Sequence, residues 1–314
     1  MRRQKFAKTL IWIVDRAVSI AFWAVLLLIL FFAIYVTADN RRILAEASGD
    51  VYQSYKPTAD DSLSFDELVQ INGDVIGWLT IDDTKIDYPL VQGRNNHIYI
   101  NTAVSGEFSL SGSLFLDYRN SPDFTDPLSI VYGHNMAGDV MFGCLDKYSD
   151  PTFFSNHLNG SLYFKGAYYK LQVFAYFSAD GHDARVYAPR ADEERCRAWL
   201  ERIGQIAVNR TEEIPDNGPI LLLSTCSTDQ TNGRDLLALS IRPGGSPPPA
   251  KGDGHTSYSG TRLRNTGEDR SPVPYLVMAG VALLMLTVLF VLLKRKKRKK
   301  DNGEQGKQAR RNGA

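Results

Sequence analysis

Two long apolar segments frame a region of short apolar runs in this chain. The segments, residues 17–36 and 275–293, contain no charged residue and approach the ~20 residues that cross a bilayer. We therefore predict two transmembrane helices. Basic residues precede the first segment, and the run KRKKRKK at 294–300 follows the second. Because basic flanks stay in the cytoplasm, both termini are expected inside the cell membrane and the intervening region outside.

Each flank has an alternative interpretation. The first segment could be a cleaved signal peptide, but its apolar part exceeds the usual length, and Val36-Thr37-Ala38 is a weak cleavage site. An uncleaved anchor is favoured. The C-terminal basic run could bind nucleic acid, but its position directly after an apolar segment favours a membrane stop. We expect no nucleic-acid partner.

The pattern also divides the chain into parts of different character. A Gly/Pro/Ser-rich stretch without apolar periodicity is typical of a linker. The expected parts are a basic N-terminus (1–16), a transmembrane helix (17–36), a polar stalk (37–63), a folded domain (64–243), a linker (244–274), a second transmembrane helix (275–293) and a basic cytoplasmic tail (294–314).

Short runs inside the folded domain predict a mainly β structure. Ser64 and Glu67 have capping-box spacing and predict a helix over 64–71. Over 190–206, Cys196, Trp199, Leu200 and Ile203 would share one face of a helix. The other expected elements are strands at 76–81, 86–91, 112–116 and 129–132, short helices at 140–148 and 151–157, and a hairpin over 161–179.

Composition adds little about partners and more about chemistry. The net charge of +1 over 314 residues gives no information about the charge of a partner. The cysteines, Cys144, Cys196 and Cys226, are odd in number, so at least one thiol is free outside the cell. Cys144 and Cys196 either pair or lie in the core. Neither zinc-ligand spacing nor a nucleotide-binding motif is present, so we expect no metal and no cofactor.

Residues 219–243 carry the clearest chemical signal. Apolar runs at 220–223 and 236–241 predict two strands joined by a polar turn. Cys226 would lie at the end of the first strand, and Arg234 just before the second. A nearby cation favours the nucleophilic thiolate, and a guanidinium can donate to an oxyanion. The alternative is a buried structural cysteine beside a solvated arginine.

A thiol nucleophile also needs an acid or base. Of the five histidines, His134 follows the apolar run 128–132 and a glycine, at the expected end of a strand. The other histidines lie in polar loops, in the linker or at the end of a short helix. His134 is therefore the candidate partner of Cys226, although a histidine at a strand end can also be structural.

Several motifs together resemble the class B sortases. The signature consists of Tyr132-Gly133-His134-Asn135-Met136, then Leu223-Ser224-Thr225-Cys226, then Arg234. Further similar blocks are GWLTIDDTKIDYPLVQGRNNHIYIN (77–101), GSLFLDYRN (112–120) and MFGCLDKYSDPTFFSNH (141–157). The similarity spans about residues 64–242, and the long helix before the cysteine strand fits it.

The resemblance implies a closed eight-stranded sortase-type β-barrel with added helices. It also implies a membrane-anchored cysteine transpeptidase, with Cys226 attacking the Thr carbonyl of a sorting motif. His134 would protonate the leaving amine, and Arg234 would hold the substrate or the oxyanion. The implied substrate contacts are Asn96, Asn135, Ser224 and Thr225. Asp229 is either a polar orienting residue or a solvated turn residue.

The implied partners are secreted proteins that bear a sorting signal. The acceptor would be an amine of the peptidoglycan precursor or a pilin Lys. Leu222 replaces the Thr that heads the family pattern, and a second membrane segment is more familiar in class C. Two alternatives stay open: a cysteine endopeptidase resolved by water, and a non-catalytic surface binding protein.

The tail itself resembles a sorting signal. LRNTG at 263–267 precedes a polar spacer, an apolar segment and a basic run. Arg264 stands where such motifs have Pro, which would preset the peptide's backbone. The segment is either a degenerate signal that a sortase cuts or a linker to a second anchor, and the second interpretation is favoured.

Overall fold

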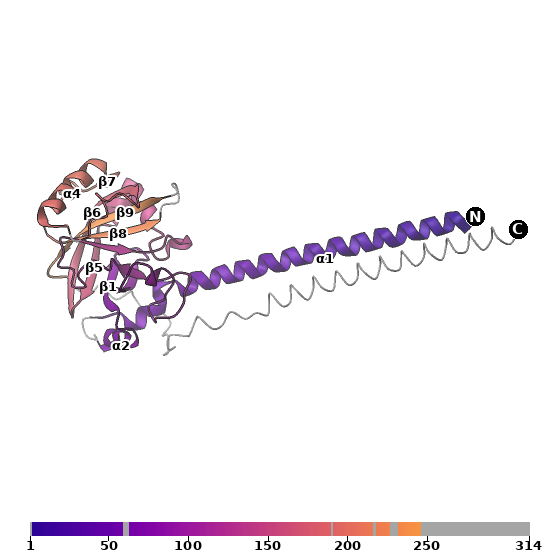
Figure 1. The fold of residues 1–314 in the computed structure, drawn as a ribbon, viewed down its shortest axis with the longest axis horizontal. Helices are drawn as coiled ribbons and strands as arrows, with labels where there is room; N and C mark the ends of the chain where they lie inside the picture. The colour runs from indigo at the N-terminus through magenta and orange to yellow at the C-terminus, as the bar shows by residue number, and fades with distance from the viewer. Residues whose placement is uncertain (1, 59–62, 190, 216–217, 227–231, 246–314) are drawn as a thin grey trace. The chain divides into compact units, whose positions relative to one another are not determined.

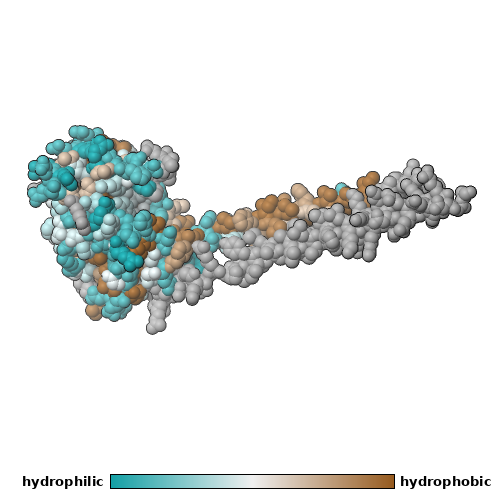
Figure 2. Space-filling view, viewed as in Figure 1, coloured by the Kyte–Doolittle hydropathy of each residue, from teal (hydrophilic) through white to brown (hydrophobic). Residues whose placement is uncertain are grey.

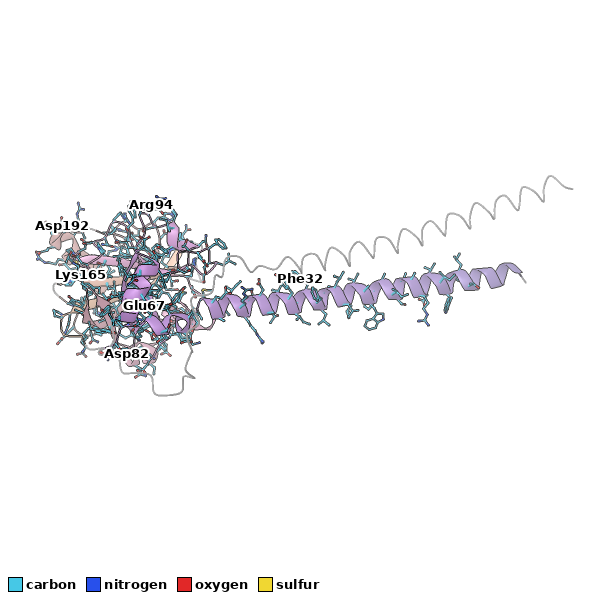
Figure 3. The ribbon with its side chains drawn as sticks, turned by 90° about the horizontal axis from the view of Figure 1, so that it is seen from below. Phe32, Glu67, Asp82, Arg94, Lys165 and Asp192 are labelled. Carbon is cyan, nitrogen blue, oxygen red and sulfur yellow. The ribbon has the colours of Figure 1, made fainter. Side chains whose placement is uncertain are left out.

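Helix α1 (Arg2–Glu46) contains the first predicted membrane segment. The computed structural model describes residues 2–58, 63–189, 191–215, 218–226 and 232–245. Within them, one helix at the N-terminal end is long and apolar enough to cross a membrane, judged by length and composition. Its exposed apolar side chains form a brown band in Figure 2, and Phe32 projects from it in Figure 3. The linker beyond residue 245, the second predicted span and the tail lie outside the described residues.

The domain after α1 is built on a single closed sheet (Figure 1). Nine strands pair in the order β5-β1-β2-β3-β4-β8-β9-β6-β7, and β5 also pairs with β6. The strands are β1 (Val75–Ile81), β2 (Asp87–Val91), β3 (Leu114–Leu116), β4 (Leu128–Tyr132), β5 (Asn159–Phe164), β6 (Ala167–Asp180), β7 (Asn209–Arg210), β8 (Ile220–Cys226) and β9 (Gly233–Arg242). Apart from the two-residue β7, eight strands close a ring, which confirms the predicted eight-stranded barrel.

The barrel is mixed in strand direction. The β2–β3 and β4–β8 pairs are parallel, and the other pairs are antiparallel. Parallel neighbours need a long crossover connection. The chain between β4 and β8 supplies this crossover with β5, β6, helix α4 (Glu193–Ile206) and β7. The predicted hairpin over 161–179 is the β5–β6 pair.

Alternating side chains give the sheet two apolar faces. On β8, Leu221 and Leu223 pack with the cluster that fills the barrel, whereas Ile220 and Leu222 pack beneath α4. Figure 1 shows α4 beside β6 and β9. The predicted inner face of α4, formed by Cys196, Trp199, Leu200 and Ile203, is buried. The amphipathic pattern therefore placed this helix correctly.

A second apolar cluster covers another part of the outer surface. Helix α2 (Leu63–Ile71) buries Phe65 and Leu68 there, against Trp78 and Tyr163. A 3₁₀ helix, η1 (Gly49–Tyr55), adds Tyr52 to the same cluster. The surface away from these clusters is charged, as the exposed side chains of Glu67, Arg94, Lys165 and Asp192 show (Figure 3).

Two local predictions need correction. The helix expected at 140–148 is wrong: residues 145–149 form a 3₁₀ helix, η4 (Leu145–Ser149), and the segment before it is irregular. Asp139 and Met141 have φ values of 65° and 55°, which a right-handed helix does not accommodate. Helix α2 begins at Leu63, so Ser64 lies in its first turn rather than at its cap. The short helix α3 (Pro151–Asn156) is confirmed.

The segment between α1 and α2 is fixed to the barrel through a buried carboxylate. Asp87 on β2 is 3% exposed and accepts hydrogen bonds from Trp78 Nε1 at 2.8 Å and Thr80 Oγ1 at 2.9 Å. Lys56 Nζ, which follows η1, lies 2.7 Å from Asp87 Oδ1. Gln53 Nε2 donates to Asp87 Oδ2 at 3.0 Å. Part of the predicted stalk therefore packs as a component of the folded domain.

This environment lowers the pKa of Asp87. Burial by itself would raise the pKa, but the charge of Lys56 and the hydrogen bonds from Lys56, Trp78 and Thr80 outweigh it. The folded pKa thus lies below the unfolded value of about 3.9. The ionised carboxylate stabilises the folded chain fully above about pH 4, and this contribution is lost as the pH falls through the folded pKa.

We expect Asp87→Ala to destabilise the domain by about 3 kcal/mol, because Lys56 is left buried without its partner. For a domain of this size the thermal midpoint should fall by roughly 6–12 °C. The variant should also lose part of the acid sensitivity of stability below about pH 4. Thermal unfolding of the full chain in detergent, followed at several pH values, measures both effects. Glu201→Ala, at an exposed position on α4, is the control, and an equal effect in the two variants would contradict the prediction.

Candidate functional site

Three strands end side by side at one rim of the barrel. β4 lies parallel to β8 with Tyr132 opposite Ser224. β4 ends there, and the next residue, Gly133, donates its backbone N–H to the Ser224 carbonyl at 3.2 Å; His134 follows Gly133, and Cys226 comes two residues after Ser224 on β8. β9 runs antiparallel to β8 and places Arg234 directly opposite Cys226. Strand register therefore pairs the backbones of the candidate nucleophile and cation, and the segment that carries His134 leaves β4 beside the same strand.

The β8–β9 pairing extends further toward the rim than the sequence predicted. Cys226 was expected at the end of the first strand and Arg234 just before the second, whereas the two residues form the final pair of the β8–β9 ladder. The Arg234 side chain is half-buried and passes over Gly181, where an added Cβ would lie 3.2 Å from Arg234 Nε. A side chain at position 181 would therefore crowd the guanidinium.

Ser224 and Thr225 line the strand before Cys226, and both are buried. The Ser224 hydroxyl is 2.9 Å from the hydroxyl of Tyr187, in the loop between β6 and α4. Thr225 Oγ1 is buried and has no hydrogen-bond partner among the residues that the structure describes. A buried hydroxyl without a partner carries a desolvation cost.

An aromatic pair continues from Ser224 along the outside of the barrel. The rings of Tyr187 and Tyr132 are stacked, with centroids 6.4 Å apart and planes at 14°. The Tyr132 hydroxyl donates to Asp117 Oδ2 at 3.0 Å. Burial first, and then the charge of Asp117, raises the pKa of Tyr132. Tyr132 is therefore neutral at physiological pH and acts as the donor to this carboxylate.

Asp117 is fully buried and collects donors at the end of β3. Arg119 donates to it through Nε at 2.9 Å and Nη2 at 2.8 Å. Burial would raise the pKa of Asp117, but the hydrogen bonds from Arg119 and Asn96 hold it below its usual value. The carboxylate is thus ionised, and by accepting the hydrogen bond from the Tyr132 hydroxyl it holds that side chain in place.

Asn96 is engaged within the fold rather than at the strand ends. Its Nδ2 donates to Asp117 Oδ2 at 2.9 Å, and its Oδ1 accepts from the Tyr118 backbone N–H at 2.9 Å. It is connected to the rim through Asp117 and Tyr132. A role in substrate binding stays a prediction for Asn96. Asn135 lies at the rim, half-buried, next to His134.

Sequence reasoning did not single out Tyr187 or Asp235. Asp235 follows Arg234 on β9 and is buried, and it accepts hydrogen bonds from Tyr176 at 3.0 Å and Ser178 at 3.2 Å. An acidic residue beside the apolar run 236–241 is a signal that could have indicated it. Tyr187 lies in a polar loop and carries no such signal. Asp229 lies outside the described residues.

The remaining thiols are unsuited to nucleophilic chemistry. Cys144 and Cys196 are free and buried, so they do not pair with each other. Burial, and secondarily the charge of Asp139, raises the pKa of Cys144 to about 12. Burial also raises the pKa of Cys196. Both side chains therefore behave as core residues, the interpretation that the sequence left open beside their pairing.

His134 is positioned by two contacts outside its own strand. Its Nε2 lies 2.9 Å from the backbone carbonyl oxygen of Ile100, and its own carbonyl accepts from the Phe142 backbone N–H at 3.0 Å. Across the described ranges, no group of three or more His, Cys, Asp or Glu side chains could hold a metal ion. A thiol, an imidazole and a guanidinium are the parts that acyl transfer requires.

Comparisons with known proteins agree with this arrangement. No family model matches the chain. The sortase B of Listeria monocytogenes is 31% identical over 210 residues, which span 65% of this chain and 85% of that protein. The similarity therefore extends over most of the length of the Listeria protein.

Solved structures show the same relationship. A class B sortase of Streptococcus pyogenes that is involved in pilus biogenesis superposes with a TM-score of 0.52 at 40% identity, covering 57% of this chain and 97% of that one. Sortase B of Bacillus anthracis gives a TM-score of 0.56 at 30% identity, covering 66% and 98%. The chain therefore belongs to the class B sortases and is a cysteine transpeptidase.

Proposed function

We propose that the chain is a membrane-anchored sortase that cleaves a C-terminal sorting motif of secreted proteins at the carbonyl of Thr. The observation that carries the proposal is the strand register, which pairs Cys226 with Arg234 and pairs Ser224, two residues before Cys226, with Tyr132, two residues before His134. Family membership favours transpeptidation over the plain endopeptidase and the non-catalytic surface protein.

The reaction divides into two acyl transfers. The Cys226 thiolate attacks the Thr carbonyl carbon, and the resulting oxyanion is stabilised by hydrogen bonds from Arg234. The C–N bond then breaks, the leaving amine takes a proton from His134, and a thioester remains on Cys226. An acceptor amine attacks the thioester, its proton passes to His134, and the Cys226 thiolate is released.

Nearby polar groups contact the substrate in this proposal. Ser224 and Thr225 border the nucleophile, and the unpartnered hydroxyl of Thr225 can hydrogen-bond to the peptide. Asn135 and Asn96 are further substrate contacts, although Asn96 would first have to give up one of its internal hydrogen bonds.

Two acceptors fit the chemistry: an amine of the peptidoglycan precursor and a Lys side chain of a pilin. The 40% identical Streptococcus pyogenes protein is involved in pilus biogenesis, which supports the pilin lysine. Incubating the full chain with sorting peptides and each amine in turn distinguishes the acceptors by the mass of the amide product.

Replacing the nucleophile should abolish the reaction without unfolding the domain. We expect Cys226→Ala to form neither a thioester nor an amide product from any sorting peptide, as measured by mass spectrometry. Cys144→Ala and Cys196→Ala should keep most activity, because both thiols are buried and have raised pKa values. Product formation by Cys226→Ala would remove this cysteine from the mechanism.

A charge-conserving change at position 234 should be costly. Arg234→Lys is expected to lower kcat by about 100-fold or more, because an ammonium does not reproduce the planar donor pair offered to the oxyanion. Arg242→Lys, at the exposed far end of the same strand, should be within about twofold of wild type, as expected for surface changes. A rate for Arg234→Lys close to that of Arg242→Lys would contradict the assignment.

The proposed topology places both termini in the cytoplasm, because basic residues flank both apolar segments on the same side. Protease added to wall-stripped cells should digest the 38–274 region and spare epitope tags at both ends, as judged by immunoblotting. Permeabilised cells, in which both tags should be lost, are the control. Digestion of the C-terminal tag in intact cells would refute the two-span arrangement.

A further inference from the structure

The contact between His134 and Ile100 determines which imidazole nitrogen works in the reaction. Nε2 lies 2.9 Å from the Ile100 carbonyl oxygen. A carbonyl has no proton to give, so Nε2 carries the hydrogen and donates it. Nδ1 is then the nitrogen that exchanges a proton with the thiol and the leaving amine. Histidines in catalytic sites are commonly held by a hydrogen bond at the nitrogen away from the chemistry.

The Ile100 carbonyl belongs to a rigid part of the connection between β2 and β3. It ends the 3₁₀ helix η2 (Ile98–Ile100), whose central residue, Tyr99, is buried. The Tyr99 hydroxyl donates to Asp74 Oδ2 at 2.9 Å and accepts from Asn72 Nδ2 at 2.9 Å. The Tyr99 carbonyl accepts from the Ser113 backbone N–H at 3.0 Å. These contacts come from elements on both sides of η2.

Gly112 lies close to this carbonyl. A Cβ on residue 112 would lie 2.4 Å from the carbonyl oxygens of both Tyr99 and Ile100. Its φ of +59° is also in the left-handed region that favours glycine. Next to it, Ser113 Oγ donates to the Thr102 carbonyl at 2.7 Å. The chain that leads into β3 therefore leaves no room for a side chain at position 112 beside the residue that holds His134.

We propose that the Ile100 carbonyl orients the His134 imidazole during transpeptidation, and that Gly112 is the positioning residue that keeps this carbonyl in place. The proposal rests on the acid and base role proposed above for His134. The carbonyl accepts the Nε2 hydrogen and keeps the ring directed, while the backbone itself cannot take the proton that Nδ1 exchanges.

Gly112→Ala tests the proposal, with Gly106→Ala as a matched control. Gly106 lies in the same connection and has a φ of +87°, but a Cβ there would meet nothing within 4 Å. Both variants strain a left-handed residue, and only Gly112→Ala displaces the Ile100 carbonyl. The full chain in detergent is assayed for kcat and KM with a sorting peptide and an amine.

The second measurement is the exchange of the His134 Nε2 proton with solvent, observed by ¹⁵N-histidine NMR. The signal is assigned by its loss in His134→Gln.

We expect Gly112→Ala to lower kcat by up to about 100-fold, because a small misplacement of a reacting group has effects of this order. KM should change little. Proton protection should fall by about tenfold, the effect of losing roughly 1.4 kcal/mol of hydrogen bonding. Gly106→Ala should keep both values.

Equal kcat and equal proton protection in the two alanine variants would overturn the proposal. If Gly112→Ala does not fold, Ser113→Ala is the deciding variant, because it removes only the hydrogen bond from the Ser113 hydroxyl to Thr102. A reduced kcat and reduced proton protection in Ser113→Ala would support the proposal, and wild-type values of both would overturn it. Wild-type activity in His134→Gln would instead overturn the role of His134 in the proposed function. An inactive His134→Gln with an undisturbed Gly112→Ala would reject this inference alone.

Discussion

The parallel pairing of β4 with β8 is the constraint on which the catalytic rim depends. It aligns Tyr132 with Ser224, while the antiparallel β8–β9 pair sets Arg234 opposite Cys226. A parallel pair cannot be closed by a tight turn, and β5, β6, α4 and β7 form the connection between β4 and β8. The apolar residues of β8 face both clusters of the domain, which opposes any shift of register, because a shift by one residue would exchange the two faces.

A polar scaffold supports the outer side of this rim. Ser224, Tyr187 and Tyr132 are joined by a hydroxyl contact and a ring stack, and Tyr132 ends on the ionised carboxylate of Asp117. Buried polar groups are costly unless they are satisfied, and satisfied networks of this kind make a structure rigid. The loop that carries Tyr187 is therefore attached to the same strand as the candidate nucleophile, which limits how far the two can separate.

A similar principle fixes the N-terminal approach to the barrel. Asp87 satisfies donors from its own sheet and from the segment that follows α1. The chain leaving the apolar helix is thus attached to the domain by a buried ion pair as well as by the side chain of Tyr52. Such a pair specifies where the segment docks, because removing either partner leaves a buried charge.

The sequence by itself determined the features that depend on periodicity and local chemistry. Alternating apolar residues predicted the strands, spacing of three and four predicted the buried face of α4, and the motif around Cys226 identified the family. It failed at 140–148, where the residue pattern suits a helix but Met141, like Asp139 just before the segment, adopts a left-handed backbone conformation. Only the tertiary structure decided three hydrogen bonds: from Asn96 to Asp117, between Tyr187 and Ser224, and between His134 and the Ile100 carbonyl. Every residue carries a backbone carbonyl, so no pattern of side chains marks the one that will orient a histidine; that choice is made only when distant segments pack together.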